Sequence, residues 1–263
     1  MLRVLRLAWA MFLMQLKRRL AYRGDLAIQA MDELLRGLVA LAMLKVYVSK
    51  TSSIGGYGPW ELLFILGYSL VPISLFHCLC GNLYQVSSRY ILDGQLDRIL
   101  LRPYPVVLQI CFDRLGIEDL GGAVLGVTLM AIAAGHLPAL WDAGHLLALV
   151  VLLASSFVLV TAIFMIFAAS GFWFEDRVGM VPPVYNLMEF GRWPVDIYHW
   201  ALKLLITCVI PFAFIAFYPA GWLVGRGDGW LPALLTPVIA TLAFLVAMAV
   251  WRAGVRRYSS AGS

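Results

Sequence analysis

Long apolar segments alternate with short polar ones along most of the chain. A helix that crosses a bilayer needs about 20 mostly apolar residues, and six segments reach that length: residues 25–48, 60–83, 105–134, 145–172, 200–218 and 231–251. Hydrophobic residues make up 62% of the chain and charged residues only 13%, about half the charged share of a soluble domain. The pattern therefore predicts an all-α integral membrane protein, with residues 25–263 forming one domain of six transmembrane helices.

The first 24 residues have a different pattern. Apolar side chains from Val4 to Leu16 recur at helical spacing, while basic side chains lie mostly on the other side of the helix. A basic amphipathic helix of this kind lies in the membrane interface and does not cross the bilayer. Residues 1–24 are therefore expected to form a cytoplasmic amphipathic helix ahead of the six spans.

The basic residues predict the orientation. Six spans place 16 of the 20 Lys and Arg residues on one side of the membrane and three on the other, namely Lys45, Lys50 and Arg226. Because loops rich in Lys and Arg stay in the cytoplasm, both termini are expected there. The net charge of +5 follows from this arrangement and does not indicate a nucleic-acid partner.

The polar segment between the second and third spans, residues 84–104, has a helical pattern of its own. Ile91, Leu96 and Leu100 recur near helical spacing, while Asp93 and Asp97 lie on a polar side. The segment is therefore expected to contain a short amphipathic helix that ends at Pro103. Such a helix can dock into a groove of a soluble partner or rest on lipid headgroups, and the spacing alone favours neither.

Two other polar segments interrupt the later spans. Residues 173–199 mix charges with prolines, which indicates a cytoplasmic or interfacial position. Residues 219–230 are partly apolar but rich in glycine. That composition predicts a short segment that re-enters the membrane before the last span without crossing it.

Charged residues inside the predicted spans are candidates for a functional site. Asp32, Glu33 and Arg36 lie near the cytoplasmic end of the first span, and Asp113, Arg114, Glu118 and Asp119 lie in the third. A charge at the centre of a bilayer costs about 2.5–3.5 kcal/mol on insertion scales. These residues therefore either face a translocation path or a dimer interface, or they lie at headgroup depth. Arg114 and Glu118 are four residues apart and can pair on a helix.

Two pairs of glycines have the spacing that allows helices to approach closely. They are Gly122 with Gly126 and Gly221 with Gly225. Small residues four positions apart form one flat strip of a membrane helix. Both pairs are therefore candidates for a dimer face.

Several activities lack the residues they need. No GxxxxGK[ST] phosphate loop occurs, so the energy for any uphill transport must come from an ion gradient or from a partner. His77 and Cys78 are adjacent potential metal ligands, but the sequence has no second cluster of ligands to complete a metal site. Residues 225–228 match the GxGD of intramembrane aspartyl proteases, but no second Asp follows a Tyr inside a span. Neither a metal site nor protease activity is expected.

Three segments carry a resemblance to a known family. They are LDGQLDRILLRPYP at residues 92–105, EFGRWPVDIY at residues 189–198 and VIPFAFIAFYPAGWLVG at residues 209–225. Together with the basic N-terminal helix and the six-span plan, they resemble the membrane subunits of ABC transporters of the type-2 permease class. The last two segments are similar to a bacterial branch often encoded with a second, divergent permease.

The resemblance implies a permease subunit of an ATP-driven exporter in the bacterial cytoplasmic (inner) membrane. The implied partners are two ATPase subunits, which would bind ATP and Mg²⁺, and a second permease, with a paralogous heterodimer favoured over a homodimer. The chain itself would bind no cofactor and carry no catalysis. The absence of a large extracellular domain between the first two spans disfavours a lipoprotein or macrolide-type extruder.

The resemblance also assigns roles to segments. Residues 1–24 would be the elbow helix, residues 219–230 would match short re-entrant helices on the outer side, and residues 89–103 would be the coupling helix that enters a cleft on the ATPase. The coupling residues would be Arg89, Asp93, Gly94, Leu96, Asp97, Arg98, Leu100 and Arg102.

Two alternatives compete with this interpretation. An ion-gradient-driven secondary transporter would need inverted repeats and an ionisable residue near the membrane midplane. The two halves show no convincing repeat, and residues 146–170 and 231–250 contain no Asp, Glu, Lys, Arg or His. A membrane enzyme acting on lipid would need His and carboxylate clusters, and no such pair is present. The ABC permease is therefore the favoured interpretation.

Overall fold

The structure, a computed structural model, describes residues 53–137, 143–174, 180–226 and 231–259, and isolated positions between residues 13 and 46. Within these residues the chain is helical apart from turns, loops and one bridge between Ile54 and Tyr57, which confirms the all-α prediction. The predicted elbow helix and first span fall largely outside the described residues, as do Asp32, Glu33 and Arg36. A described position of that span, Gly37, lies against Leu125.

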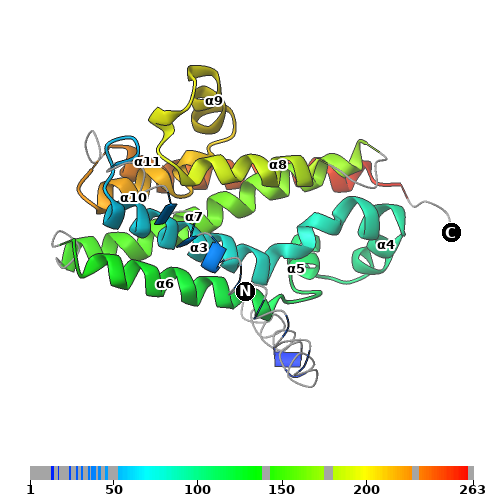
Figure 1. Cartoon of the computed structure of the whole chain (residues 1–263). Helices are drawn as coiled ribbons and strands as arrows, with labels where there is room; N and C mark the ends of the chain where they lie inside the picture. Colours follow the sequence, from blue (N-terminus) through cyan, green and yellow to red (C-terminus); the bar gives the residue numbers. More distant parts are fainter. Residues whose placement is uncertain are drawn as a thin grey trace.

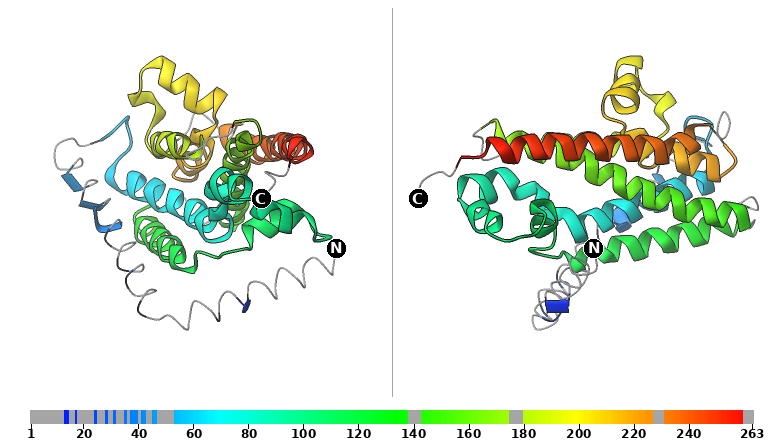
Figure 2. Two further views of the ribbon diagram at one scale, coloured as in Figure 1. Left: turned by 90° about the vertical axis from the view of Figure 1, so that its right-hand side faces the viewer. Right: turned by 180° about the vertical axis from the view of Figure 1, so that it is seen from behind.

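Four long helices form a bundle (Figure 1). They are α3 (Pro59–Cys80), α6 (Leu120–Ala134), α7 (Ala143–Ala169) and α11 (Leu231–Arg257). Helix α3 packs most extensively on α6, and α11 packs along α7, as the rear view in Figure 2 shows. The most apolar part of α3 is 72% buried and that of α11 only 22%. Helix α3 is therefore the centre of the bundle, while α11 presents most of its apolar surface to lipid or another subunit.

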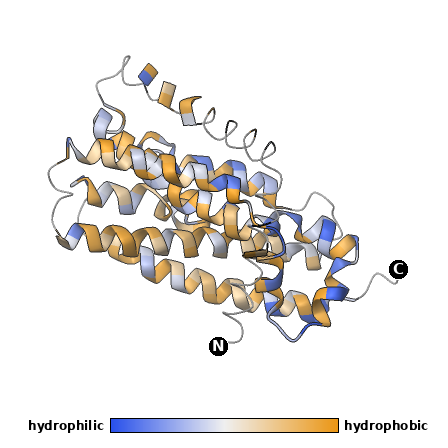
Figure 3. Ribbon diagram, turned by 90° about the horizontal axis from the view of Figure 1, so that it is seen from below, coloured by the Kyte–Doolittle hydropathy of each residue, from blue (hydrophilic) through white to orange (hydrophobic). Residues whose placement is uncertain are grey.

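The described residues hold four helices long and apolar enough to cross a membrane: Pro59–Leu92, Ile117–Ala134, Ala143–Phe172 and Ala233–Arg257. A fifth crossing is possible if a bent pair of helices, Trp200–Val209 and Phe212–Leu223, counts as one. The second, fourth and sixth predicted spans are therefore found as membrane-length helices. Figure 3 shows hydrophobic residues along the length of the bundle and hydrophilic ones gathered at the end that bears α4 (Gln95–Leu100). We call this end the α4 end.

Helix α3 begins and ends differently from its predicted span. Pro59 occupies the first turn, and the Glu61 carboxylate accepts a hydrogen bond of 2.7 Å from the backbone N–H of Gly58, which satisfies a free donor at the helix start. At its other end the helix continues through a 3₁₀ turn, η1 (Gly81–Gln85), and a π turn, η2 (Val86–Leu92). The helical path is therefore 34 residues long and extends beyond the predicted end at residue 83.

The third predicted span, residues 105–134, is wrong as a single helix. The chain forms α5 (Val106–Cys111), a non-helical segment at residues 112–116, a 3₁₀ turn η3 (Ile117–Asp119) and then α6. The cause is Asn82, whose side-chain amide donates hydrogen bonds to three carbonyls after and within α5, those of Ile110, Cys111 and Arg114. Asp113 and Arg114 therefore precede the membrane-length helix Ile117–Ala134, while Glu118 and Asp119 lie in its first turn, η3. Arg114 and Glu118 do not face each other on one helical turn.

The fifth predicted span, residues 200–218, is also interrupted. Helix α9 (Trp200–Leu204) and a π turn, η8 (Leu205–Val209), lead to Pro211, and a 3₁₀ turn, η9 (Phe212–Phe214), leads to α10 (Phe217–Leu223). The two halves meet at 68°, because Pro211 cannot donate the backbone hydrogen bond that would continue the helix. Helix α9 projects from the bundle in Figure 1. The predicted re-entrant segment, residues 219–230, contributes the last part of α10, and its residues 227–230 are outside the described part.

The polar segment before α9 forms short helices, as expected for a segment that does not cross the membrane. They are α8 (Val181–Met188), η6 (Glu189–Arg192) and η7 (Val195–Ile197). The 3₁₀ turn η5 (Ser170–Phe172) comes before them and ends the membrane-length helix that contains α7. Helix α8 lies against α7.

Glycines make the α3–α6 contact. A Cβ atom on Gly67 would lie 2.7 Å from the carbonyl oxygen of Gly126, and one on Gly126 would lie 2.6 Å from that of Gly67. Gly122 is also buried within the chain. The interpretation of Gly126 as a dimer face is therefore wrong, because α3 already covers this position of α6.

Candidate functional site

The predicted coupling helix is shorter than expected. A left-handed turn at Gly94, with φ +69°, separates the π turn η2 from α4. Glycine adopts this conformation without steric cost. Arg89 therefore lies in η2, Asp93 and Gly94 form the turn, and Arg102 follows the helix.

The apolar residues of α4 divide between the core and the surface. Leu96 is 0% exposed and belongs to the core, so its assignment as a partner-facing residue is wrong. Leu100 is 41% exposed and Leu101 is 86% exposed. We call the exposed end of α4 at Leu100 and Leu101 the tip. Leu101, which the sequence prediction omitted, is the apolar side chain most available to a partner there. Its neighbours Arg98 and Arg102 are exposed as well.

Arg89 makes polar contacts with other residues of the permease itself. Its Nε donates to Oε1 of Gln95 at 2.9 Å, and its Nη2 forms an ion pair of 3.2 Å with Asp113. The same carboxylate oxygen of Asp113 accepts a hydrogen bond of 2.9 Å from the Tyr90 hydroxyl. Arg89 and Tyr90 therefore connect the start of α4 to the segment that follows α5.

A second connection supports the segment after α4. The buried side-chain amide of Gln109, in α5, donates to the carbonyl of Ile99 at 3.2 Å and to that of Tyr104 at 2.9 Å. Helix α4 is thus held by α5 and η2. After the end of α11, burial raises the pKa of the Tyr258 hydroxyl, and the nearby carboxylate of Asp97 raises this pKa further.

A polar pocket of about 460 Å³ lies between the end of α3, η3 and α8. Its lining includes His77, Tyr84, Asp119 and Tyr185. Nε2 of His77 and the hydroxyl of Tyr84 are 3.1 Å apart. Sequence reasoning missed this pocket because its residues come from three segments more than 30 positions apart. In the part of the chain that the structure describes, no group of three or more His, Cys, Asp or Glu side chains is arranged to hold a metal ion.

The second glycine pair, Gly221 and Gly225, lies at the end of the bundle opposite α4. Gly225, with φ +76°, ends α10, and the backbone N–H groups of Gly225 and Arg226 donate to the carbonyls of Trp222 and Gly221. This pattern is the Schellman motif that closes a helix. A Cβ on Gly221 would lie 3.1 Å from the Tyr57 hydroxyl. Gly221 therefore packs within the chain, against Tyr57, and its interpretation as a dimer face is wrong. Gly225 is exposed, and the structure explains it by the left-handed turn that closes α10.

Most of the sequence matches one family. Residues 34–262 match the model of a family described as ABC-2 family transporter protein. The chain belongs to this ABC-2 transporter family. Comparison with curated proteins and with solved structures found no match.

Family membership assigns the protein to a class of membrane permeases. The protein is a multi-pass membrane permease of an ABC-type transporter, a class that is generally not catalytic and that associates with ATP-binding subunits. The permease has an exposed tip at α4 and a separate polar pocket beside α8. The tip is the part of the described chain in which apolar side chains project beyond the bundle between basic residues.

Proposed function

We propose that this permease is the membrane subunit of an ATP-driven exporter and that the tip at Leu100 and Leu101 docks into the ATPase. The observation that supports the proposal is the exposure of Leu101, 86%. Leu100 beside it is 41% exposed, and an exposed apolar pair gains free energy when a partner covers it. Arg98 and Arg102 flank it and would complement acidic groups at the rim of a groove.

The polar contacts of α4 and its buried side chain Leu96 provide a route for force. A displacement of α4 by an ATPase would act on α5 through Gln109, on the segment before α6 through Arg89 and Asp113, and on the core through Leu96. ATP can drive transport only if the ATPase binds the inward-open and outward-open states of the permease with different affinity. Helix α4 is the element through which we expect that difference to act.

The remaining parts of the proposal concern the assembly. We expect a second, paralogous permease and two ATPase subunits, with the α4 end and both termini in the cytoplasm of a bacterial cell and the spans in its inner membrane. The basic residues Arg98, Arg102, Arg252, Arg256 and Arg257 at the α4 end support this orientation. Family membership favours an ATP-driven mechanism over the ion-driven alternative.

The test is co-purification of the ATPase with tagged permease variants. We expect Leu101→Glu to lose the ATPase and the transport-coupled ATP hydrolysis, while Leu101→Met, which keeps the apolar contact, retains both. The amount of assembled permease in the membrane serves as the folding control. If Leu101→Glu yields as much active complex as wild type, the docking assignment is refuted.

A further inference from the structure

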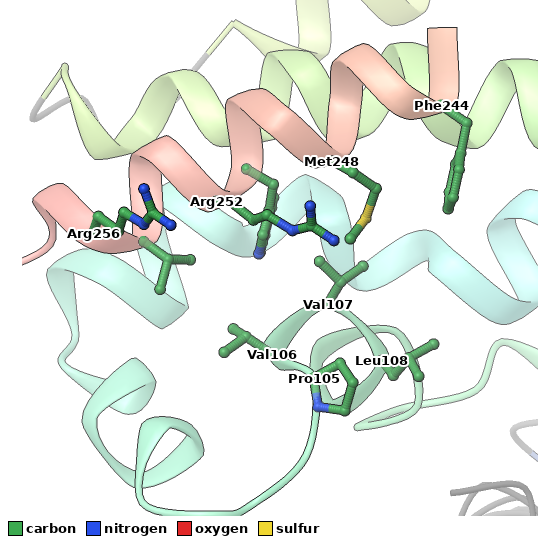
Figure 4. Close-up of a pocket in the computed structure, with 10 residues that line it drawn as sticks. Pro105, Val106, Val107, Leu108, Phe244, Met248, Arg252 and Arg256 are labelled. Atoms are coloured by element: carbon green, nitrogen blue, oxygen red, sulfur yellow. The ribbon is translucent and has the colours of Figure 1, made fainter. Parts of the chain in front are cut away.

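A groove of about 560 Å³ lies between the start of α5 and the last turns of α11 (Figure 4). Val106, Val107 and Leu108 form its wall on α5. The other wall is one face of α11, where residues recur every four positions: Phe244, Met248, Arg252 and Arg256. Figure 4 shows the two apolar side chains at one end of this row and the two guanidinium groups at the other. The groove is therefore apolar along its length and cationic at one end.

The cationic end has unmet polar groups. Arg252 and Arg256 are exposed, and among the described residues neither has an acidic partner. Trp251, which also lines the groove, is 2% exposed, and its indole N–H has no acceptor within the described chain. A buried donor without an acceptor costs free energy. The groove thus offers two positive charges and one buried donor to a ligand with anionic oxygens.

The position of the groove along α11 indicates which ligand is available. The apolar run from residue 231 to residue 250 is 20 residues long, which at about 1.5 Å per residue spans the roughly 30 Å hydrocarbon core of a bilayer. Trp251 and the two arginines then lie at headgroup depth, while Phe244 and Met248 lie at the depth of acyl chains. Tryptophan is itself enriched at this interface.

We propose that the groove binds an anionic phospholipid from the leaflet at the α4 end. Arg252 and Arg256 would hold the phosphate by charge-assisted hydrogen bonds, and the indole N–H of Trp251 would donate to a phosphate or ester oxygen. One acyl chain would lie along Met248 and Phe244. A lipid with a single net negative charge fits the paired arginines better than a zwitterionic one, because its headgroup brings no cation to repel them.

The lipid would also bridge parts of the permease that the chain connects only indirectly. The ring of Trp251 packs edge-to-face on Phe172, with ring centroids 5.5 Å apart, and Phe172 packs in the same way on Tyr258. Tyr258 is the residue beside Asp97 of α4. An occupied groove would therefore join α5 to α11 next to the tip. This inference requires only that the protein spans a membrane and does not depend on the direction of transport.

The experiment is native mass spectrometry of the complex purified in mild detergent and supplied with phosphatidylglycerol or phosphatidylcholine. We compare Arg252→Gln and Arg256→Gln with Arg257→Gln, which removes the same charge from the same helical turn but does not line the groove. We expect wild type to retain phosphatidylglycerol in preference, and either groove variant to weaken retention roughly tenfold. Arg257→Gln should retain it as wild type does.

A second variant tests the indole. Trp251→Phe keeps an aromatic ring against Phe172 but removes the N–H, and we expect weaker retention of phosphatidylglycerol with unchanged assembly. Equal retention of both lipids by wild type, or equal loss in Arg257→Gln, would overturn the proposal. So would a photoreactive residue at position 108 that cross-links to a protein subunit and not to lipid, because the groove would then be a subunit interface.

Discussion

The backbones of Gly67 and Gly126 are in direct contact, and neither position has room for a Cβ atom. This contact sets the distance between α3, at the centre of the bundle, and α6. Close approach of two membrane helices increases van der Waals contact along their whole length. The spacing between α3 and α6 therefore requires glycine at both positions, because a side chain at either would push the helices apart.

We expect Gly126→Ala to destabilise the permease by about 1–3 kcal/mol, the usual cost of forcing extra volume into a packed core. The matched control is Gly121→Ala, which makes the same change on an exposed position of α6. The measurement is the midpoint of thermal unfolding in detergent. A similar midpoint for both variants would show that α3 and α6 can separate without cost.

Leu96 and Leu101 should respond in opposite ways to the same substitution. Leu96→Ala empties a fully buried site, and we expect it to lower the free energy of unfolding by about 2–5 kcal/mol. Leu101→Ala should leave stability within about 0.5 kcal/mol of wild type while weakening ATPase binding. Thermal unfolding and ATPase co-purification separate the two effects. Equal loss of stability would mean that Leu101 is buried against the permease itself.

Asp113 should affect coupling more than docking. Asp113→Ala removes the acceptor shared by Arg89 and Tyr90, so the start of α4 loses its connection to the segment before α6. We expect normal ATPase binding but ATP hydrolysis that no longer supports transport. Asp196→Ala, which removes an exposed carboxylate from η7 and not from the α4 segment, is the control and should retain coupling. Loss of ATPase binding in Asp113→Ala would instead assign the residue to the docking surface.

Glu61 and Arg226 form an ion pair of 2.9 Å at the opposite end of the bundle, yet they should contribute unequally. Glu61 is mostly buried and also accepts the hydrogen bond from Gly58 at the start of α3, so Glu61→Ala should cost about 1–2 kcal/mol. Arg226→Ala removes an exposed partner and should cost less than about 1 kcal/mol. Thermal unfolding of both single variants and the double variant measures the coupling between them. An equal cost for each would mean that the ion pair alone stabilises this end.

The apolar pattern was sufficient to predict α3, α7 and α11, because each contains a long run without charges. It could not predict the interruption at residues 112–116, since the cause is Asn82, a side chain 28 to 32 positions away in sequence. The pattern likewise predicted that α4 is amphipathic but not which side is covered. That depends on the neighbouring elements, which bury Leu96 and leave Leu101 exposed.

The two pockets show the same limit. The groove between α5 and α11 combines residues 105–108 with residues 244–256, and the polar pocket combines three segments. Each segment alone has an ordinary composition for a membrane protein. The glycine pairs were recognisable as sites of close approach, but sequence could not distinguish a contact within the chain from one between chains.

The helical path from Pro59 to Leu92 is longer than a bilayer is thick. Its 34 residues measure about 50 Å at 1.5 Å per residue, and the hydrocarbon core takes about 30 Å of this length. The length beyond the hydrocarbon core would place an ATPase bound at Leu101 outside the lipid headgroups. Opening and closing of the ATPase would then move the permease without deforming the membrane. The gap between the ATPase and the membrane surface would leave the polar pocket accessible from the side.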